Sequence, residues 1–167
     1  MANFGGIFQK KSERPRIRPA GTRIDDLLRF AAIAIGLTLP VYGLTEHANL
    51  PATIPGRNGP TSSSSILIIS CFGVVLVGLM LLLQRWPWMS NTLVAITEEN
   101  AEIQYRLTNR LLSIVSIEIG ILFLLATLDM VNRARGIPPV DQLVFLTAMM
   151  SWIPVLGWYF WASFRHA

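Results

Sequence analysis

Four long apolar runs decide what this chain can fold into, and they occupy residues 27–44, 65–83, 111–128 and 143–164. Each run is close to the roughly 20 residues with which an α-helix crosses a hydrocarbon core about 30 Å thick. Only 14% of the 167 residues are charged, and the mean hydropathy is +0.48. Soluble domains carry about 25% charged residues. The sequence therefore predicts an all-α polytopic membrane protein with four transmembrane helices, divided into an arm, 1–23, and a membrane domain, 24–167.

Basic residues are distributed unequally among the segments that flank these runs. Eleven of the 14 Lys and Arg residues lie in or beside the arm, the second connection and the C-terminal tail, and three lie in the other two connections. Lys and Arg in short loops favour the cytoplasmic side of a membrane. We therefore expect both termini in the cytoplasm and the connections 45–64 and 129–142 on the outer side.

The arm is the most basic part of the chain, and it lacks an apolar period. We expect a flexible segment that lies on anionic lipid headgroups, with a specific docking motif as the alternative. Because this charge beside the first run accounts for the pI of about 9.8, no nucleic-acid partner is expected. The predicted lipid-facing residues are Lys10, Lys11, Arg14, Arg16, Arg18 and Arg23.

The stretch ITEENAEIQYRLTNRLL, residues 96–112, is charged but runs without a break into the third apolar run. Thr97 suits a helix N-cap, glutamates follow it, and Glu102 has the i, i+4 spacing to pair with Arg106. A helix from about 98 to 130 would be about 50 Å long, of which about 30 Å fits in hydrocarbon. We therefore expect residues 97–110 to protrude into the cytoplasm as an amphipathic extension of a long third helix.

Glu118 is the one ionisable residue deep inside an apolar run. A carboxylate there costs a few kcal/mol, so a functional role is the working hypothesis. A hydrogen bond to a neighbouring helix is the structural alternative. Ser113 and Ser116 are close in sequence and are expected to belong to the same intramembrane polar site.

A second candidate site lies in the outer connection TEHANLPATIPGRNGPTSSSS. Glu46 and His47 are adjacent, and Arg57 is the one fixed cation of this connection. These side chains either form an outward-facing polar site or are solvated loop residues.

The sequence carries little that suits catalysis. Its two histidines, His47 and His166, are expected on opposite sides of the membrane, which leaves no haem or zinc ligand set. No phosphate-binding loop, dinucleotide fingerprint or nucleophile elbow is present. We expect no cofactor, no metal and no enzymatic activity.

The segment VAITEENAEIQYRLTNRLL, residues 94–112, resembles the signature of a bacterial family of small integral membrane proteins. This family is a domain of unknown function, and it includes the Sdp-type toxin-immunity proteins. Its signature, of the form ITEENAExQYRL, joins the second and third spans. The resemblance implies a location in the bacterial inner membrane. The residues that carry it are Thr97, Glu98, Glu99, Asn100, Gln104, Tyr105 and Arg106.

The outer connection matches the same family only in part. Family members read like LPxxIPxHFNxxGxxDxWG after the first span, and here Leu50, Pro51, Ile54, Pro55 and Gly59 agree with that pattern. Arg57 and Asn58 stand in place of His-Phe-Asn, and Thr61 and serines replace the residues that follow.

Three functions are compatible with these features. The first is an accessory or interaction subunit that docks on a larger membrane complex or on itself. The second is a toxin-immunity or signal-sensing protein that binds a ligand on the outer face. The third is a proton-linked transporter centred on Glu118.

Overall fold

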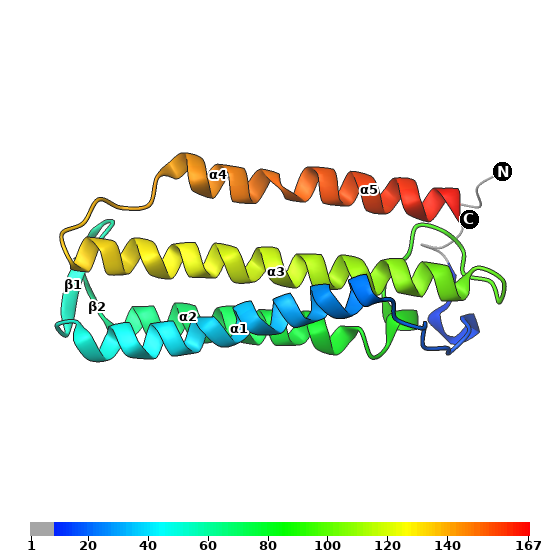
Figure 1. Cartoon of the computed structure of the whole chain (residues 1–167), viewed down its shortest axis with the longest axis horizontal. Coiled ribbons are helices and arrows are strands. Elements are labelled where there is room, and N and C mark those ends of the chain that lie inside the picture. The colour runs from blue at the N-terminus through cyan, green and yellow to red at the C-terminus, as the bar shows by residue number, and fades with distance from the viewer. Residues whose placement is uncertain (1–8) are drawn as a thin grey trace.

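The computed structural model describes residues 9–167, and its long helices lie side by side along one axis (Figure 1). Of the described residues, 69% are helical. Within the described residues, four helical segments are long and apolar enough to span a membrane. This confirms the mostly helical, four-span prediction. The helices are α1 (Arg23–Asn49), α2 (Ser64–Leu83), α3 (Ala101–Ala134), α4 (Gln142–Met150) and α5 (Trp152–Arg165).

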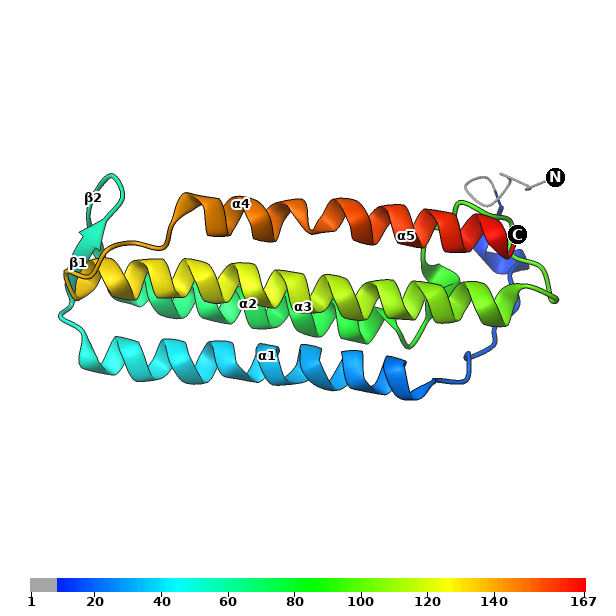
Figure 2. The same cartoon turned by 45° about the horizontal axis from the view of Figure 1, so that its top comes forward.

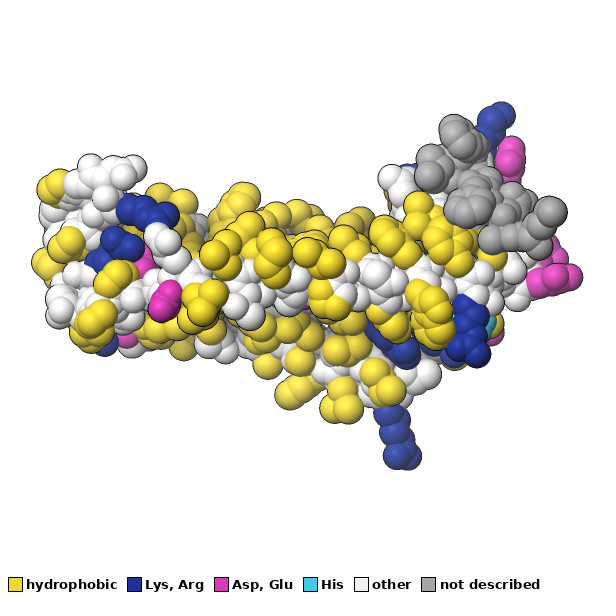
Figure 3. All heavy atoms as spheres, turned by 90° about the horizontal axis from the view of Figure 1, so that it is seen from above, with side chains coloured by type: hydrophobic (Ala, Val, Ile, Leu, Met, Phe, Trp, Pro, Cys, Tyr) yellow, Lys and Arg dark blue, Asp and Glu magenta, His cyan; other side chains and the backbone are white. Residues whose placement is uncertain are grey.

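The bundle has two distinct ends (Figures 1 and 2). Helix α1 begins and α5 finishes at the end that also holds the connection from α2 to α3, which we call the terminal end. The opposite, hairpin end holds strands β1 (Thr53–Gly56) and β2 (Gly59–Ser62) and the connection from α3 to α4. On the face seen in Figure 3, charged side chains gather toward the two ends and apolar side chains cover the length between them. This distribution suits a middle section that contacts hydrocarbon.

Helix α1 is longer than the predicted span 27–44 at both ends. It begins with a capping box, in which Thr22 Oγ1 accepts from the Asp25 backbone N–H and the Asp25 carboxylate accepts from the Thr22 N–H. The helix then continues through Pro40 as far as Asn49. Asp25 is thus used in forming the helix as well as in the contacts described below.

The first connection is an antiparallel β-hairpin, a departure from the all-α prediction. Ile54 pairs with Thr61 in its register, and Gly59 takes a φ of 128°, which an L side chain rarely adopts. The Ile54 side chain is buried against Ile66 and Val131. This contact with α2 and α3 holds the hairpin, and it depends on residues far apart in sequence.

Helices α1, α2 and α3 pack on one another, whereas α4 and α5 pack mainly on α3. Both ribbon views show α3 between the α1–α2 pair and the α4–α5 segment (Figures 1 and 2). Side chains of α4 and α5 such as Leu143 and Ile153 remain 68% and 65% exposed. The fourth span is therefore attached to the bundle along one side only.

The fourth span, predicted as 143–164, is broken at Ser151 into α4 and α5. Pro154 has no N–H to donate to the carbonyl of Met150, so the helical hydrogen bonding is interrupted one turn before the proline. Asp141 begins α4 by accepting a hydrogen bond from the Leu143 N–H at 2.8 Å.

The arm differs from the prediction of a flexible, lipid-facing segment. Its first eight residues lie outside the described part of the chain, but from Gln9 onward it packs on the connection between α2 and α3. The Gln9 carboxamide donates to the Ile96 carbonyl and accepts from the Ile96 N–H. Arg14 is 4% exposed and donates to the Ser90 carbonyl at 2.6 Å, so its predicted lipid contact is wrong. The other predicted lipid-facing residues are exposed; they are Lys10, Lys11, Arg16, Arg18 and Arg23.

Packing of α3 on α1 predicts that Gly120 resists substitution. A Cβ added to Gly120 would lie 2.3 Å from Ile35 Cγ2, a methyl group on a β-branched side chain with little rotamer freedom. We expect Gly120→Ala to lower the free energy of unfolding by about 1–3 kcal/mol. Gly78→Ala is the matched control, because nothing lies within 4 Å of its added Cβ. Thermal unfolding in a mild detergent measures both, and equal stability of the two variants would contradict this packing.

Candidate functional site

Glu118 lies on the side of α3 that faces the fourth span. It is 8% exposed, and its Oε1 lies 3.1 Å from the Ser151 hydroxyl, at the break between α4 and α5. The same hydroxyl lies 2.7 Å from the Ala148 carbonyl. A hydroxyl has one hydrogen, so Ser151 donates to one of these two acceptors at a time. Glu118 Oε2 is buried and has no hydrogen-bond partner in the described part of the chain.

Ser113 and Ser116 do not join Glu118 in one site. Ser113 accepts a hydrogen bond from Gln84 of α2 at 3.0 Å, and Ser116 donates to the Leu112 carbonyl of its own helix. Successive residues of an α-helix are rotated by about 100°, so positions 116 and 118 lie on opposite sides of α3. The predicted three-residue site is wrong in this respect, and Ser151 is the partner that the sequence did not indicate.

The predicted outer-loop site also separates into different contacts. Glu46 is buried and accepts from Arg135 at 2.6 Å. Arg57 is exposed and lines a surface pocket of about 380 Å³ with Asp129 and Arg133, which pair with each other at 3.0 Å. Among the described residues, no hydrogen bond or ion pair joins Glu46, His47 and Arg57 to one another. Because Glu46 pairs with Arg135 at the end of α3, these three residues do not form a single ligand site.

The signature stretch folds somewhat differently from its prediction. Thr97 and Asn100 bind each other, with the Thr97 N–H donating to Asn100 Oδ1 and the Asn100 N–H donating to Thr97 Oγ1. These two bonds close a turn, and α3 begins only at Ala101. Glu98 and Glu99 therefore lie before the helix and are exposed. The predicted ion pair between Arg106 and Glu102 is present at 2.6 Å.

Gln104 and Tyr105 connect α3 to both ends of the chain. Gln104 is 1% exposed, and its Nε2 donates to the carbonyls of Ser163 at 2.9 Å and His166 at 3.0 Å. The Tyr105 ring is fully buried, and its hydroxyl donates to the Pro15 carbonyl at 2.8 Å. These two signature residues thus have structural roles that a sequence pattern alone does not reveal.

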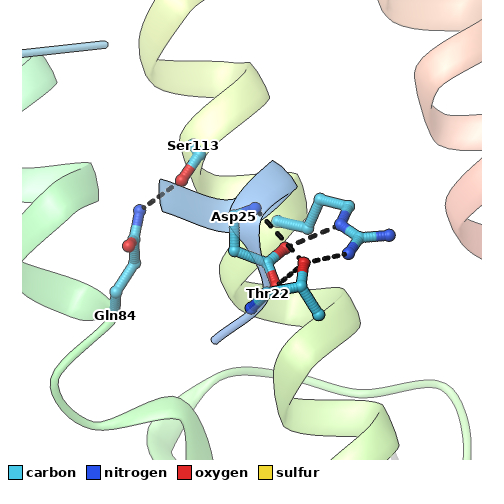
Figure 4. A network of polar contacts seen from close by, with 5 residues as sticks. Thr22, Asp25, Gln84 and Ser113 are labelled. Atoms are coloured by element: carbon cyan, nitrogen blue, oxygen red, sulfur yellow. Dashed lines mark hydrogen bonds and ion pairs between the residues drawn. The ribbon is translucent and has the colours of Figure 1, made fainter. Parts of the chain in front are cut away.

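An ion pair between Asp25 and Arg110 joins the first turn of α1 to the third turn of α3. Arg110 Nε lies 2.8 Å from Asp25 Oδ1, and the two side chains are 21% and 9% exposed. Figure 4 shows this carboxylate beside Thr22, with the hydrogen bond between Gln84 and Ser113 nearby. The two partners are 85 residues apart along the chain, so the pair is not apparent from sequence.

The two ion pairs of α1 occur at corresponding ends of the parallel helices α1 and α3. Asp25 and Glu46 are 21 residues apart on α1, and their partners Arg110 and Arg135 are 25 apart along the chain. At 1.5 Å per residue, the interval on α1 is about 32 Å. This is close to the roughly 30 Å of a hydrocarbon core.

Among the described side chains, no group of three His, Cys, Asp or Glu residues is placed to hold a metal ion.

Comparison with known proteins returns no family model, no curated protein and no solved structure that matches this chain. The resemblance of residues 94–112 to the toxin-immunity family therefore stays a prediction.

The two arginines of the signature region are expected to differ in their contribution to stability. Arg110→Gln removes one partner of a buried ion pair, and we expect it to lower the free energy of unfolding by about 1.5–3 kcal/mol. Arg106→Gln removes an i, i+4 pair whose side chains are 32% and 53% exposed, which is worth about 0.3–0.5 kcal/mol. Denaturant unfolding in detergent compares the two, and equal losses would contradict the assigned role of Asp25.

Proposed function

We propose that this chain is a non-enzymatic accessory subunit of a larger membrane complex. In this proposal it lies in the bacterial inner membrane with both termini in the cytoplasm. The observation that carries the proposal is an exposed acidic and apolar surface at the beginning of α3. We call this surface the tip, and it consists of Glu98, Glu99, Glu102 and Ile103.

The proposed placement in the membrane rests on charge and length. Eleven of the 14 Lys and Arg residues belong to the terminal end, which favours a cytoplasmic position for that end. The interval of about 32 Å between Asp25 and Glu46 matches the hydrocarbon thickness, so the two ion pairs would lie near the two headgroup layers. Residues 101–109 of α3 would then extend about 14 Å beyond Arg110. This is the protruding extension that the sequence predicts.

The tip suits a partner segment that combines basic and apolar side chains. A pocket of about 450 Å³ is lined by Val94, Ile103 and Glu99 together with His166. Its apolar wall would take a hydrophobic side chain, and the carboxylates at its rim would attract Lys or Arg. Carboxylates are unfavourable next to anionic headgroups. The tip is therefore better suited to a protein partner than to the membrane surface.

The accessory-subunit proposal predicts that reversing one charge at the tip releases the partner. We expect the tagged protein, solubilised from its native membrane in mild detergent, to migrate with a larger partner in stoichiometric amount. Glu99→Lys places like charges opposite each other, and it should reduce the retained partner by about tenfold or more. Glu13→Lys is the matched control, because Glu13 is also exposed at the terminal end but lies outside the tip. A lone monomer or a homodimer of the wild-type chain would show the proposal to be wrong.

A second candidate function is proton-linked transport, and it is favoured by the unpartnered Glu118 Oε2 beside a helix break. The Ser151 hydroxyl has one hydrogen for two acceptors. A proton carried by Glu118 and donated to Ser151 Oγ would leave the Ser151 hydrogen free for Ala148. Gain and loss of that proton would therefore change the contact between α3 and the fourth span.

This candidate predicts that Glu118→Gln abolishes proton flux in reconstituted vesicles, since an amide cannot release a proton. Ser116→Ala is the control, because its hydroxyl binds only its own helix, and it should leave the flux within about twofold of wild type, a change of under about 0.5 kcal/mol. Absence of flux from the wild-type protein, or full flux in Glu118→Gln, would exclude this function.

A further inference from the structure

At the terminal end, three arginines from separate segments line one pocket. Arg18 precedes α1, Arg29 belongs to α1 and Arg85 follows the end of α2. The pocket measures about 420 Å³ and is completed by Pro19, Leu81, Gln84 and Asn109. None of its lining residues is acidic. Within residues 9–167, none of the three arginines belongs to an ion pair.

Arg29 is held in this pocket by a neutral partner. Its Nε donates to Gln84 Oε1 at 3.2 Å, and Gln84 in turn donates to Ser113 at 3.0 Å. The carboxylate one turn earlier in α1, Asp25, is engaged by Arg110 and Thr22. The guanidinium charge of Arg29 is therefore oriented by the fold but is not neutralised by it.

The depth of the pocket points to lipid. Arg29 is four residues beyond Asp25, so on the membrane placement proposed above it lies about 6 Å toward the bilayer centre from the first ion pair. An arginine at the edge of hydrocarbon needs an anionic partner or must extend toward the headgroups. Leu81 provides an apolar wall on the side of α2. A headgroup phosphate is the anion that an arginine extended from this depth toward the membrane surface would meet at high concentration.

We propose that this pocket binds the phosphodiester headgroup of an anionic phospholipid. Guanidinium groups form strong, charge-assisted hydrogen bonds with phosphate oxygens, and basic pockets between transmembrane helices on the cytoplasmic side suit such headgroups. Asn109 adds a neutral polar side chain to the lining of the pocket. The shared chemistry is that of a phosphate oxyanion, for which lipid and free phosphate are the two sources.

Arg18→Gln combined with Arg85→Gln tests the pocket without disturbing the fold, because neither side chain makes a hydrogen bond or ion pair in the described chain. The probe is phosphatidylglycerol added to the purified full-length protein in neutral detergent, and bound lipid is counted by native mass spectrometry. We expect one phosphatidylglycerol per chain to bind at least about tenfold more tightly than phosphatidylcholine, and the double variant to lose at least about tenfold in affinity. Arg16→Gln combined with Arg23→Gln is the matched control. It removes two exposed charges outside the pocket and should leave affinity within about twofold, which is under about 0.5 kcal/mol.

Several outcomes would overturn the proposal. Equal losses in the two double variants would indicate diffuse attraction to charge, and equal binding of phosphatidylcholine would show that the headgroup charge is not recognised. Inorganic phosphate that displaces phosphatidylglycerol at comparable concentration would assign the pocket to free phosphate. Thermal unfolding verifies that the variants fold, and Arg85→Gln alone, with an expected loss of several-fold, replaces the double variant if that one is unstable.

Discussion

Two ion pairs between the parallel helices α1 and α3 define the frame of this protein. Asp25 at the beginning of α1 binds Arg110 in the third turn of α3, and Glu46 binds Arg135 near the other ends of the two helices. Ionised side chains are costly in hydrocarbon and tolerated at headgroup depth, so on the proposed membrane placement the two pairs join the helices near the two surfaces of the bilayer. Between them the contact relies on close approach, as at Gly120 and Ile35. The remaining elements are arranged around helices α1 and α3.

The fourth span stands apart from this frame, because it packs mainly on α3 and is broken at Ser151. Among the described residues, three side-chain contacts attach it to α3: Gln104 to the end of α5, Ser151 to Glu118, and Thr108 to Tyr159. The first is satisfied at both carbonyls, whereas the second leaves a carboxylate oxygen without a partner. A partly satisfied buried polar contact contributes less stability than a fully satisfied one, so the contact at Glu118 holds the fourth span less firmly than the contact at Gln104.

The terminal end combines two surfaces of opposite charge at different depths. The arginine pocket lies near the beginning of α1 and the end of α2, and the acidic tip lies at the beginning of α3. If the bilayer is anionic on this side, it attracts the first surface and repels the second. Anchoring to lipid and presentation of the tip to a protein would thus follow from one distribution of charge.

The sequence alone determined that this chain forms four helical segments long and apolar enough to span a membrane, because the length and composition of the four apolar runs are local properties. It also determined local features, such as the Glu102–Arg106 pair and the interruption near Pro154, since both depend on residues within one or two turns. Only the tertiary structure decided the partners of Asp25, Glu46, Gln104 and Glu118. These partners are 33 to 89 residues away along the chain, and no local pattern encodes which helices become neighbours. Spacing in sequence likewise suggested that Ser113 and Ser116 belong with Glu118, but helical rotation and the position of α4 and α5 assign them to different sides of α3.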